Sequence, residues 1–283
     1  MEKVLQLIPL AEDELEALAI DGKTMRGAAR HEAVENHLLG IIAPRLGVVV
    51  KQLAVADKSQ EKGSFEQVLE GLLLTGKVIT SDALHTSREN AALVVERGGH
   101  YLHVVKDNQP DLLNDSEELF REPETWDKSL RVAEAFNLHA NRIEGRRLRV
   151  SSALRDYLAY PYQRQVMELQ RFITDKKTGS TRSEVVYAIT SLSSERAGAR
   201  DLLKLWREHW HIENRLHYVR DFTFDEDRSQ VRSGNAPQVM AAIRNLAISL
   251  LRLAGAENIA SATRKYAAKP ALAFAAIDFQ LKE

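Results

Sequence analysis

The sequence predicts a mixed α/β fold, in which helices flank a sheet of antiparallel and parallel strands and a β-rich insertion precedes the last long helices. Three strand-like segments come before the first helix, which indicates an antiparallel meander. Strands and helices then alternate, which indicates parallel pairing. Between residues 107 and 192, β-branched and aromatic residues recur in alternating patterns that favour strands.

The composition of the 283 residues, 44% hydrophobic and 28% charged, is that of a globular chain able to bury a core without cross-links. The chain has no Cys, which excludes disulfides, thiolate zinc sites and cysteine nucleophiles and fits a cytoplasmic setting. No apolar stretch approaches the roughly 20 residues that span a bilayer, and we expect no signal peptide. The net charge of −1 argues against a uniformly basic DNA-binding protein, so any DNA site must be local.

The first part of the predicted core covers residues 15–106. Two Ser/Thr-x-x-Glu/Gln patterns, at Ser64 and at Thr86, predict the starts of two helices by capping boxes. Gly98 and Gly99 are expected to end the second of these helices. The expected strands are 15–20, 37–42, 46–56, 78–80 and 101–105, and the expected helices begin at 64 and at 86.

The remaining segments are a β-rich insertion at 107–192, closing helices at 193–254 and a C-terminal tail at 255–283 that carries no sharp signal. In the first closing helix, apolar residues recur at helical spacing, which predicts one buried stripe. The stripe consists of Leu202, Leu205, Ile212, Leu216 and Val219. The insertion is expected to hold a helix at 112–120 and strands at 130–138, 146–154, 165–173 and 183–189. A last helix is expected at 237–253.

Two aspartates follow apolar strands. Asp21 comes after Leu18-Ala19-Ile20 and Asp82 after Val78-Ile79-Thr80, at the strand ends where ligands gather in open α/β sheets. Each could instead be an ordinary turn cap.

A third carboxylate, Glu213, lies on a second stripe of the first closing helix, at the edge of the buried face. The stripe holds Trp206, His209, Glu213, His217 and Arg220, at steps of 3, 4, 4 and 3. By spacing alone it could be a solvated face. Three converging carboxylates need a counter-charge, which two Mg²⁺ ions roughly 4 Å apart would supply while activating a nucleophile and stabilising the leaving oxygen of a phosphodiester.

At these positions the sequence resembles the DDE transposases of bacterial insertion sequences, specifically the H-repeat-associated group. The resemblance covers about residues 15–250 and is carried by several spaced strings in one order. The strings are Ala19–Gly27 (AIDGKTMRG), Ile79–Thr86 (ITSDALHT), Glu96–Gly99 (ERGG), Val105–Pro110 (VKDNQP), His209–Asn214 (HWHIEN) and Asp221–Asp227 (DFTFDED).

The resemblance implies an RNase H-like catalytic core with the acid triad Asp21, Asp82 and Glu213 as catalytic residues and metal ligands. It implies an enzyme that uses two Mg²⁺ or Mn²⁺ ions to cleave DNA at insertion-sequence ends, with water and then a 3′-hydroxyl as nucleophiles. The partners would be double-stranded DNA at transposon ends and target, bound by a homodimer at the nucleoid, with no membrane and no small-molecule cofactor. The wider superfamily has a Tyr-Arg-Glu-Lys signature, whose positions fall on Trp206, His209, Glu213 and Arg220; only the Glu is identical.

Further residues are candidates for DNA contact. His209 and Arg220 could meet phosphates, and Trp210 could stack on a base. For the others, a solvated surface, a turn or an exposed strand face is the alternative. These others are Lys23, Arg26, Lys106, Asn108, Arg146 and Arg147.

Two other functions stay open. The chain could be a related nuclease or resolvase that cuts without joining, or a catalytically silent remnant that only binds DNA or a partner transposase. Because few residues precede Asp21, where relatives have a helical region, we expect a truncated copy.

Overall fold

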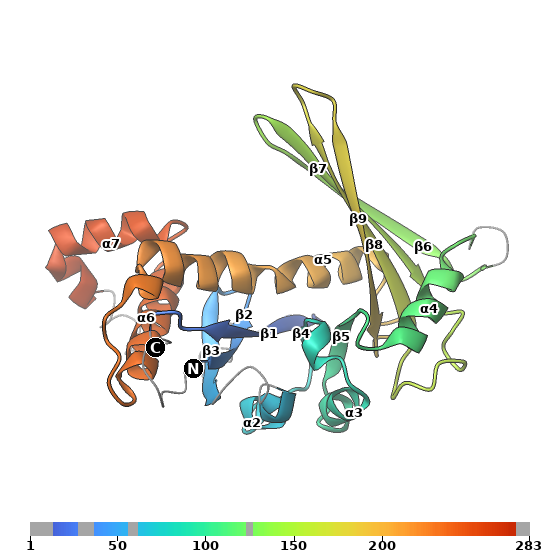
Figure 1. The fold of residues 1–283 in the computed structure, drawn as a ribbon, viewed down its shortest axis with the longest axis horizontal. Coiled ribbons are helices and arrows are strands. Elements are labelled where there is room, and N and C mark those ends of the chain that lie inside the picture. Colours follow the sequence, from blue (N-terminus) through green and yellow to red (C-terminus); the bar gives the residue numbers. More distant parts are fainter. Residues whose placement is uncertain (1–13, 28–36, 56–61, 123–126, 276–283) are drawn as a thin grey trace. The chain divides into compact units, whose positions relative to one another are not determined.

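The computed structural model describes residues 14–27, 37–55, 62–122 and 127–275, which divide into two compact units (Figure 1). The first unit takes in the described residues up to Leu72 and from Glu208 onward, and the second takes in Leu73–Arg207. The domain boundaries expected at residues 106 and 192 stay a prediction.

The sheet of the first unit is an antiparallel meander of β1 (Glu16–Thr24), β2 (His37–Ala43) and β3 (Val48–Val55). The three expected strands are therefore confirmed, but β1 extends past the expected end at Ile20. As a result Asp21 lies inside the strand, paired with Gly40, and not at its end.

The helical segments of the later part of the first unit pack on the face of this meander that carries Ala19, Ile42 and Val49. Helix α6 contacts β3, and a core of small and branched apolar side chains joins strands and helices. This core comprises Ala19, Ile42, Val49, Ile212, Leu216, Val219, Ile248 and Ile259. The helical segments are η2 (Lys62–Ser64), α2 (Phe65–Leu69), η5 (Ile212–His217), η6 (Val219–Thr223), η7 (Glu226–Arg228), α6 (Ala236–Leu253) and α7 (Ile259–Ala268).

The sheet of the second unit has the order β4-β5-β9-β8-β7-β6 and is mostly antiparallel. Only β4 (Lys77–Ser81) and β5 (His100–Val105) are parallel, joined through η3 (Ala83–His85) and α3 (Arg88–Glu96). Strand β9 pairs with β5, so the β-rich segment extends the sheet that β4 and β5 begin. The added strands are β6 (Arg131–Leu138), β7 (Arg142–Ser151), β8 (Gln165–Asp175) and β9 (Thr181–Thr190), drawn as long green to yellow arrows in Figure 1.

Two further helices belong to this part of the chain. Helix α4 (Pro110–Leu119) follows β5, and α5 (Ala199–His209) follows β9 and contains the division between the units. The expected helices at 112–120 and 237–253 and all expected strands are thus present, with shifted ends. The fold is mixed α/β, as the sequence predicts.

Two local expectations were wrong. Ser64 ends a 3₁₀ turn and makes no side-chain cap, and the helix that follows it spans only Phe65–Leu69. Helix α3 is capped by Ser87, whose hydroxyl accepts from Asn90 N–H, and not by Thr86, whose hydroxyl donates to Val104 O. The tail, for which the sequence carries no sharp signal, holds α7, in which Asn258 Oδ1 accepts from Ser261 N–H as an N-cap.

Among the described residues, every helix is too short or too polar to cross a lipid bilayer.

Candidate metal centre

Asp21 lies in the middle of β1, on the strand face that packs against η5. Side chains alternate along a strand, so Ala19, Asp21 and Lys23 share one face. Ala19 belongs to the core cluster with Ile212 and Leu216 of η5. The same packing that buries Ala19 therefore brings η5 next to Asp21.

The segment η5 presents two polar side chains to this strand. Its backbone is π-helical, and Tyr218 N–H donates to Glu213 O, five residues back. Ile212 and Leu216 are buried in the core, and Glu213 and His217 follow each of them by one position. Single π turns inside helices are frequent at functional sites.

Asp21, Glu213 and His217 form a cluster, which we call the acid–histidine cluster. His217 Nδ1 lies 3.5 Å from Asp21 Oδ2 and 3.5 Å from Glu213 Oε2. One ligand atom from each residue lies within 4.8 Å of the other two. Carboxylate oxygens and an imidazole nitrogen are ligands that Mn²⁺ and Zn²⁺ accept, and the carboxylates suit Mg²⁺. The donor set and spacing therefore fit one divalent cation.

The protonation states in the cluster are linked. The hydrogen bond from His217 lowers the pKa of Glu213 and outweighs the opposing effect of burial, and the positive charge of Lys23 lowers this pKa further. Burial lowers the pKa of His217, and Glu213 opposes this effect. Glu213 is thus held as a carboxylate and His217 favours the neutral form, the two states in which these groups ligate metals.

Lys23, on the same strand face as Asp21, is held in an ion pair. Its Nζ lies 2.6 Å from Asp221 Oδ1 and 2.7 Å from Oδ2, and its side chain is buried. The pair joins β1 to η6 on the face that Asp21 occupies. Contact of Lys23 with a DNA phosphate stays a prediction.

Asp82 belongs to the second unit and is described there by itself. It directly follows β4 and caps η3, with Oδ1 accepting from Leu84 N–H at 3.0 Å. The capping role that the sequence left open is therefore real, but it engages one of the two carboxylate oxygens. A meeting of Asp82 with Asp21 and Glu213 stays a prediction.

The loop after β5 is hydrogen-bonded to the turn that follows Asp82. Asn108 Nδ2 donates to Ala83 O at 2.6 Å, and Gln109 Nε2 donates to Thr86 O at 3.1 Å. Asn108, predicted to contact DNA, thus holds the first residue of η3, and Gln109 holds the residue that follows η3. Lys106, in the same loop, is exposed.

The predicted stripe of Trp206, His209, Glu213, His217 and Arg220 holds only in part. Glu213 and His217 lie together, whereas Arg220 is 2% exposed and pairs with Glu226, with Nε and Nη2 2.8 and 2.7 Å from Oε2. Trp206 and His209 are buried and Trp210 is half-buried.

The basic residues of the β-rich segment are largely paired with acids. Arg146 is buried and lies 3.3 Å from Glu144, and Arg147, half exposed, lies 3.7 Å from Glu134. Arg26, in the first unit, is exposed and 3.9 Å from Asp227. Of these residues, Arg26 and Arg147 have the exposure that DNA contact requires.

The sequence alone assigned no role to three residues: His217 of the acid–histidine cluster, and Asp221 and Glu226 near it in the chain. His217 stands four positions after Glu213, a spacing that could have marked it as a neighbour on one helix face. Asp221 and Glu226 lie in the acidic string after η5, and no local pattern pairs them with Lys23 and Arg220.

A known protein family and several relatives match most of the chain. The transposase DDE domain family matches residues 12–250. The chain is 28% identical over 84% of its length to the "H repeat-associated putative transposase YhhI" of Escherichia coli K12, of which it covers 65%. It is 29% identical, again over 84% of its length, to the "Putative transposase YncI" of Escherichia coli O157:H7, of which it covers 62%. The chain therefore spans less than two thirds of these relatives.

The family match covers most of the chain and includes Asp21, Asp82 and Glu213. The chain belongs to the transposase DDE domain family.

Proposed function

We propose that this protein is a DNA transposase that cleaves a phosphodiester at an insertion-sequence end and joins the freed 3′-hydroxyl to target DNA. The acid–histidine cluster carries the proposal, because it gathers two of the three acids that the resemblance implies, with a histidine, so that one ligand atom of each lies within 4.8 Å of the others. Members of this family generally use divalent metals and act on DNA.

Each side chain of the proposed site has a separate part in the reaction. Asp21, Glu213 and Asp82 would hold two divalent ions, Mg²⁺ or Mn²⁺. When bound, such ions neutralise charge on the scissile phosphate and lower the pKa of a nucleophilic water. Lys23, held by Asp221, keeps a positive charge beside the acids and so helps them stay ionised together.

The proposed architecture is RNase H-like. The antiparallel β1–β2–β3 meander and the parallel β4–β5 pair are the pieces such a core would use, and the residue ranges 15–106, 107–192, 193–254 and 255–283 stay our proposed domains. A homodimer on double-stranded DNA at the nucleoid belongs to the same proposal.

The experiment replaces Asp21 by Asn and follows nicking of supercoiled plasmid in Mg²⁺ and in Mn²⁺. Loss of a metal ligand removes several kcal/mol of transition-state stabilisation, so nicking should fall about a hundredfold or more. Asp156→Asn, the same change at an exposed position, should nick as the wild type does.

Joining of a labelled duplex oligonucleotide to the plasmid, measured in parallel, separates a transposase from a nuclease that only cuts. Undiminished nicking by Asp21→Asn, with an unchanged melting temperature, would refute the assignment.

A further inference from the structure

An exposed pair of aromatic rings lies on the segment that carries Glu213. Tyr218 and Phe222 are 55% and 72% exposed, and their rings stack with centroids 4.5 Å apart and planes 24° apart. Scattered exposed apolar side chains are ordinary, but two stacked rings form a flat surface. Such a surface can continue its stack with a third planar group.

The backbone places Tyr218, the first residue of this surface, one π turn beyond Glu213 of the acid–histidine cluster. Tyr218 N–H donates to Glu213 O, and Asn214, the residue after Glu213, donates through Nδ2 to Trp210 O. A planar group that stacks on the Tyr218 ring is therefore held one π turn from Glu213, a proposed metal ligand.

A cavity of about 590 Å³ adjoins the rings and is lined by Asn214, Tyr218 and Phe222 together with residues of α6 and α7. Its charged lining residues are Arg252, Arg264 and Glu257. Arg252 Nη1 donates to Ala256 O at 2.9 Å and to Glu257 O at 2.6 Å, which fixes the guanidinium in place.

The cavity has an excess of positive charge. Burial lowers the pKa of Arg252, and the nearby positive charge of Arg215 lowers it further. Arg215 donates to Pro44 O, a backbone carbonyl that carries no net charge. An anion in this cavity would be attracted by two lining arginines, Arg252 and Arg264, and opposed by one glutamate, Glu257.

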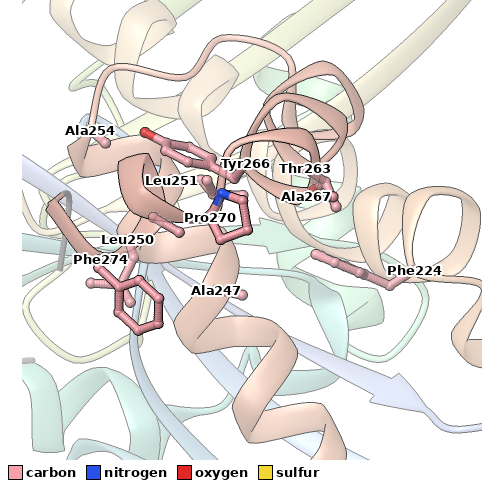
Figure 2. A pocket seen from close by; sticks show the side chains of 11 residues that line it. Phe224, Ala247, Leu250, Leu251, Ala254, Thr263, Tyr266, Ala267, Pro270 and Phe274 are labelled. Atoms are coloured by element: carbon pink, nitrogen blue, oxygen red, sulfur yellow. The ribbon is translucent and has the colours of Figure 1, made fainter.

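Another cavity, of about 520 Å³, lies between α6 and α7 and is lined almost entirely by apolar side chains, among them Leu250, Leu251, Tyr266 and Phe274 (Figure 2). Its lining contains no charged side chain. The two cavities therefore differ in the ligand they can take, and only the one beside Tyr218 combines planar rings with cations.

We propose that the cavity beside Tyr218 and Phe222 binds an unpaired nucleotide at the end of a DNA strand, with the base on the aromatic pair and the phosphate at Arg252 and Arg264. This inference rests on the proposed function, and it describes how the protein binds the DNA end that the metal centre cleaves. Base–aromatic stacking tolerates any base and is a common means of binding single strands. Ligand cavities of roughly 300–1,000 Å³ are typical, so a nucleotide fits.

The test uses the intact chain without divalent metal, so that binding is measured apart from cleavage. The probe is a duplex with a single unpaired 3′-terminal 2-aminopurine, whose fluorescence is quenched by stacking, and a blunt duplex serves as comparison. Wild type should quench the fluorophore and bind the overhang more tightly than the blunt end.

Phe222→Leu keeps an apolar side chain but removes the ring, and it should weaken overhang binding about fivefold or more and reduce quenching. Tyr218→Phe should bind as wild type. Phe274→Ala, at a ring 73% exposed in the apolar cavity, should change neither signal.

Equal affinity and quenching in wild type and Phe222→Leu would overturn the inference, as would a change of oligomeric state in Phe222→Leu by light scattering, which would make the rings a contact between copies. Nicking by the wild type without quenching would overturn this inference alone. Quenching by a wild type that never nicks would overturn the proposed function and leave nucleotide binding standing, and absence of both would overturn both.

Discussion

Burial decides the role of single charged residues in this protein. Arg220 and Lys23 have the residue type and position expected of phosphate contacts, yet both are buried in ion pairs, with Glu226 and Asp221. Glu226 also accepts from Arg244 Nη1 at 3.1 Å, so the buried carboxylate serves two cations. Buried charges persist in proteins when they are paired in this way.

The role of His217 as a metal ligand can be tested. Replacing it by Ala removes the nitrogen donor, and imidazole favours Mn²⁺ over Mg²⁺. We expect Mn²⁺ affinity to fall about tenfold or more and Mg²⁺ affinity to fall less. Mn²⁺ binding followed by electron paramagnetic resonance, and the rise of melting temperature with each metal, measure the two affinities.

His139→Ala, a change at a half-exposed histidine of the other unit, is the matched control and should leave both affinities unchanged. An identical loss for the two metals, or none, would contradict the prediction.

At the scale of elements, the π-helical winding of η5 and η6 is the feature that shapes the site. It brings Glu213 and His217 to β1, whereas Arg220 is buried in an ion pair with Glu226. Helical periodicity predicted the buried apolar stripe correctly, but spacing alone does not decide which polar side chains of the second stripe meet and which are buried in ion pairs. Short capping patterns are also an incomplete guide to where a helix begins. Ser87 caps its helix, whereas Ser64, in a similar pattern, makes no cap.

The packing around Gly145 in β7 predicts the effect of a substitution on stability. It lies opposite Phe136 of β6 and Phe172 of β8, whose rings meet edge to face at 5.8 Å. A Cβ on Gly145 would overlap the Phe172 ring. Gly145→Ala should therefore lower the free energy of unfolding by about 1–3 kcal/mol, as overpacking does.

Urea unfolding measures this loss, and Phe172→Leu in the same chain should recover part of it by giving the methyl group room. A Gly145→Ala variant as stable as the wild type would show that the ring moves aside at no cost.

At the scale of the whole molecule, a buried histidine links stability to pH. His103 in β5 is fully buried and stacks on Tyr101 at 4.6 Å. Burial, and then the nearby charge of His85, lowers the pKa of His103 to about 3. Between that value and about 6.5 the unfolded chain binds the proton and the folded chain does not, so stability falls as pH drops below about 6.5.

His103→Leu should therefore flatten the acid side of the stability curve by up to about 1.4 kcal/mol per pH unit. Urea unfolding at pH 7, 6 and 5 checks this, with His139→Leu as the exposed control. Parallel curves for wild type and His103→Leu would contradict it.

The sequence by itself determined the order of strands and helices, the buried stripe of α5 and η5 and the kinship with transposases. Periodicity and short motifs are local properties, and local sequence carries them. Only the tertiary structure decided that Asp21 lies within β1 beside Glu213 and His217, that Arg220 is buried, and that Tyr218 and Phe222 are exposed. Each of these depends on which distant segments pack together, because burial and charge pairing between residues far apart in the chain are set by the packed core and not by spacing.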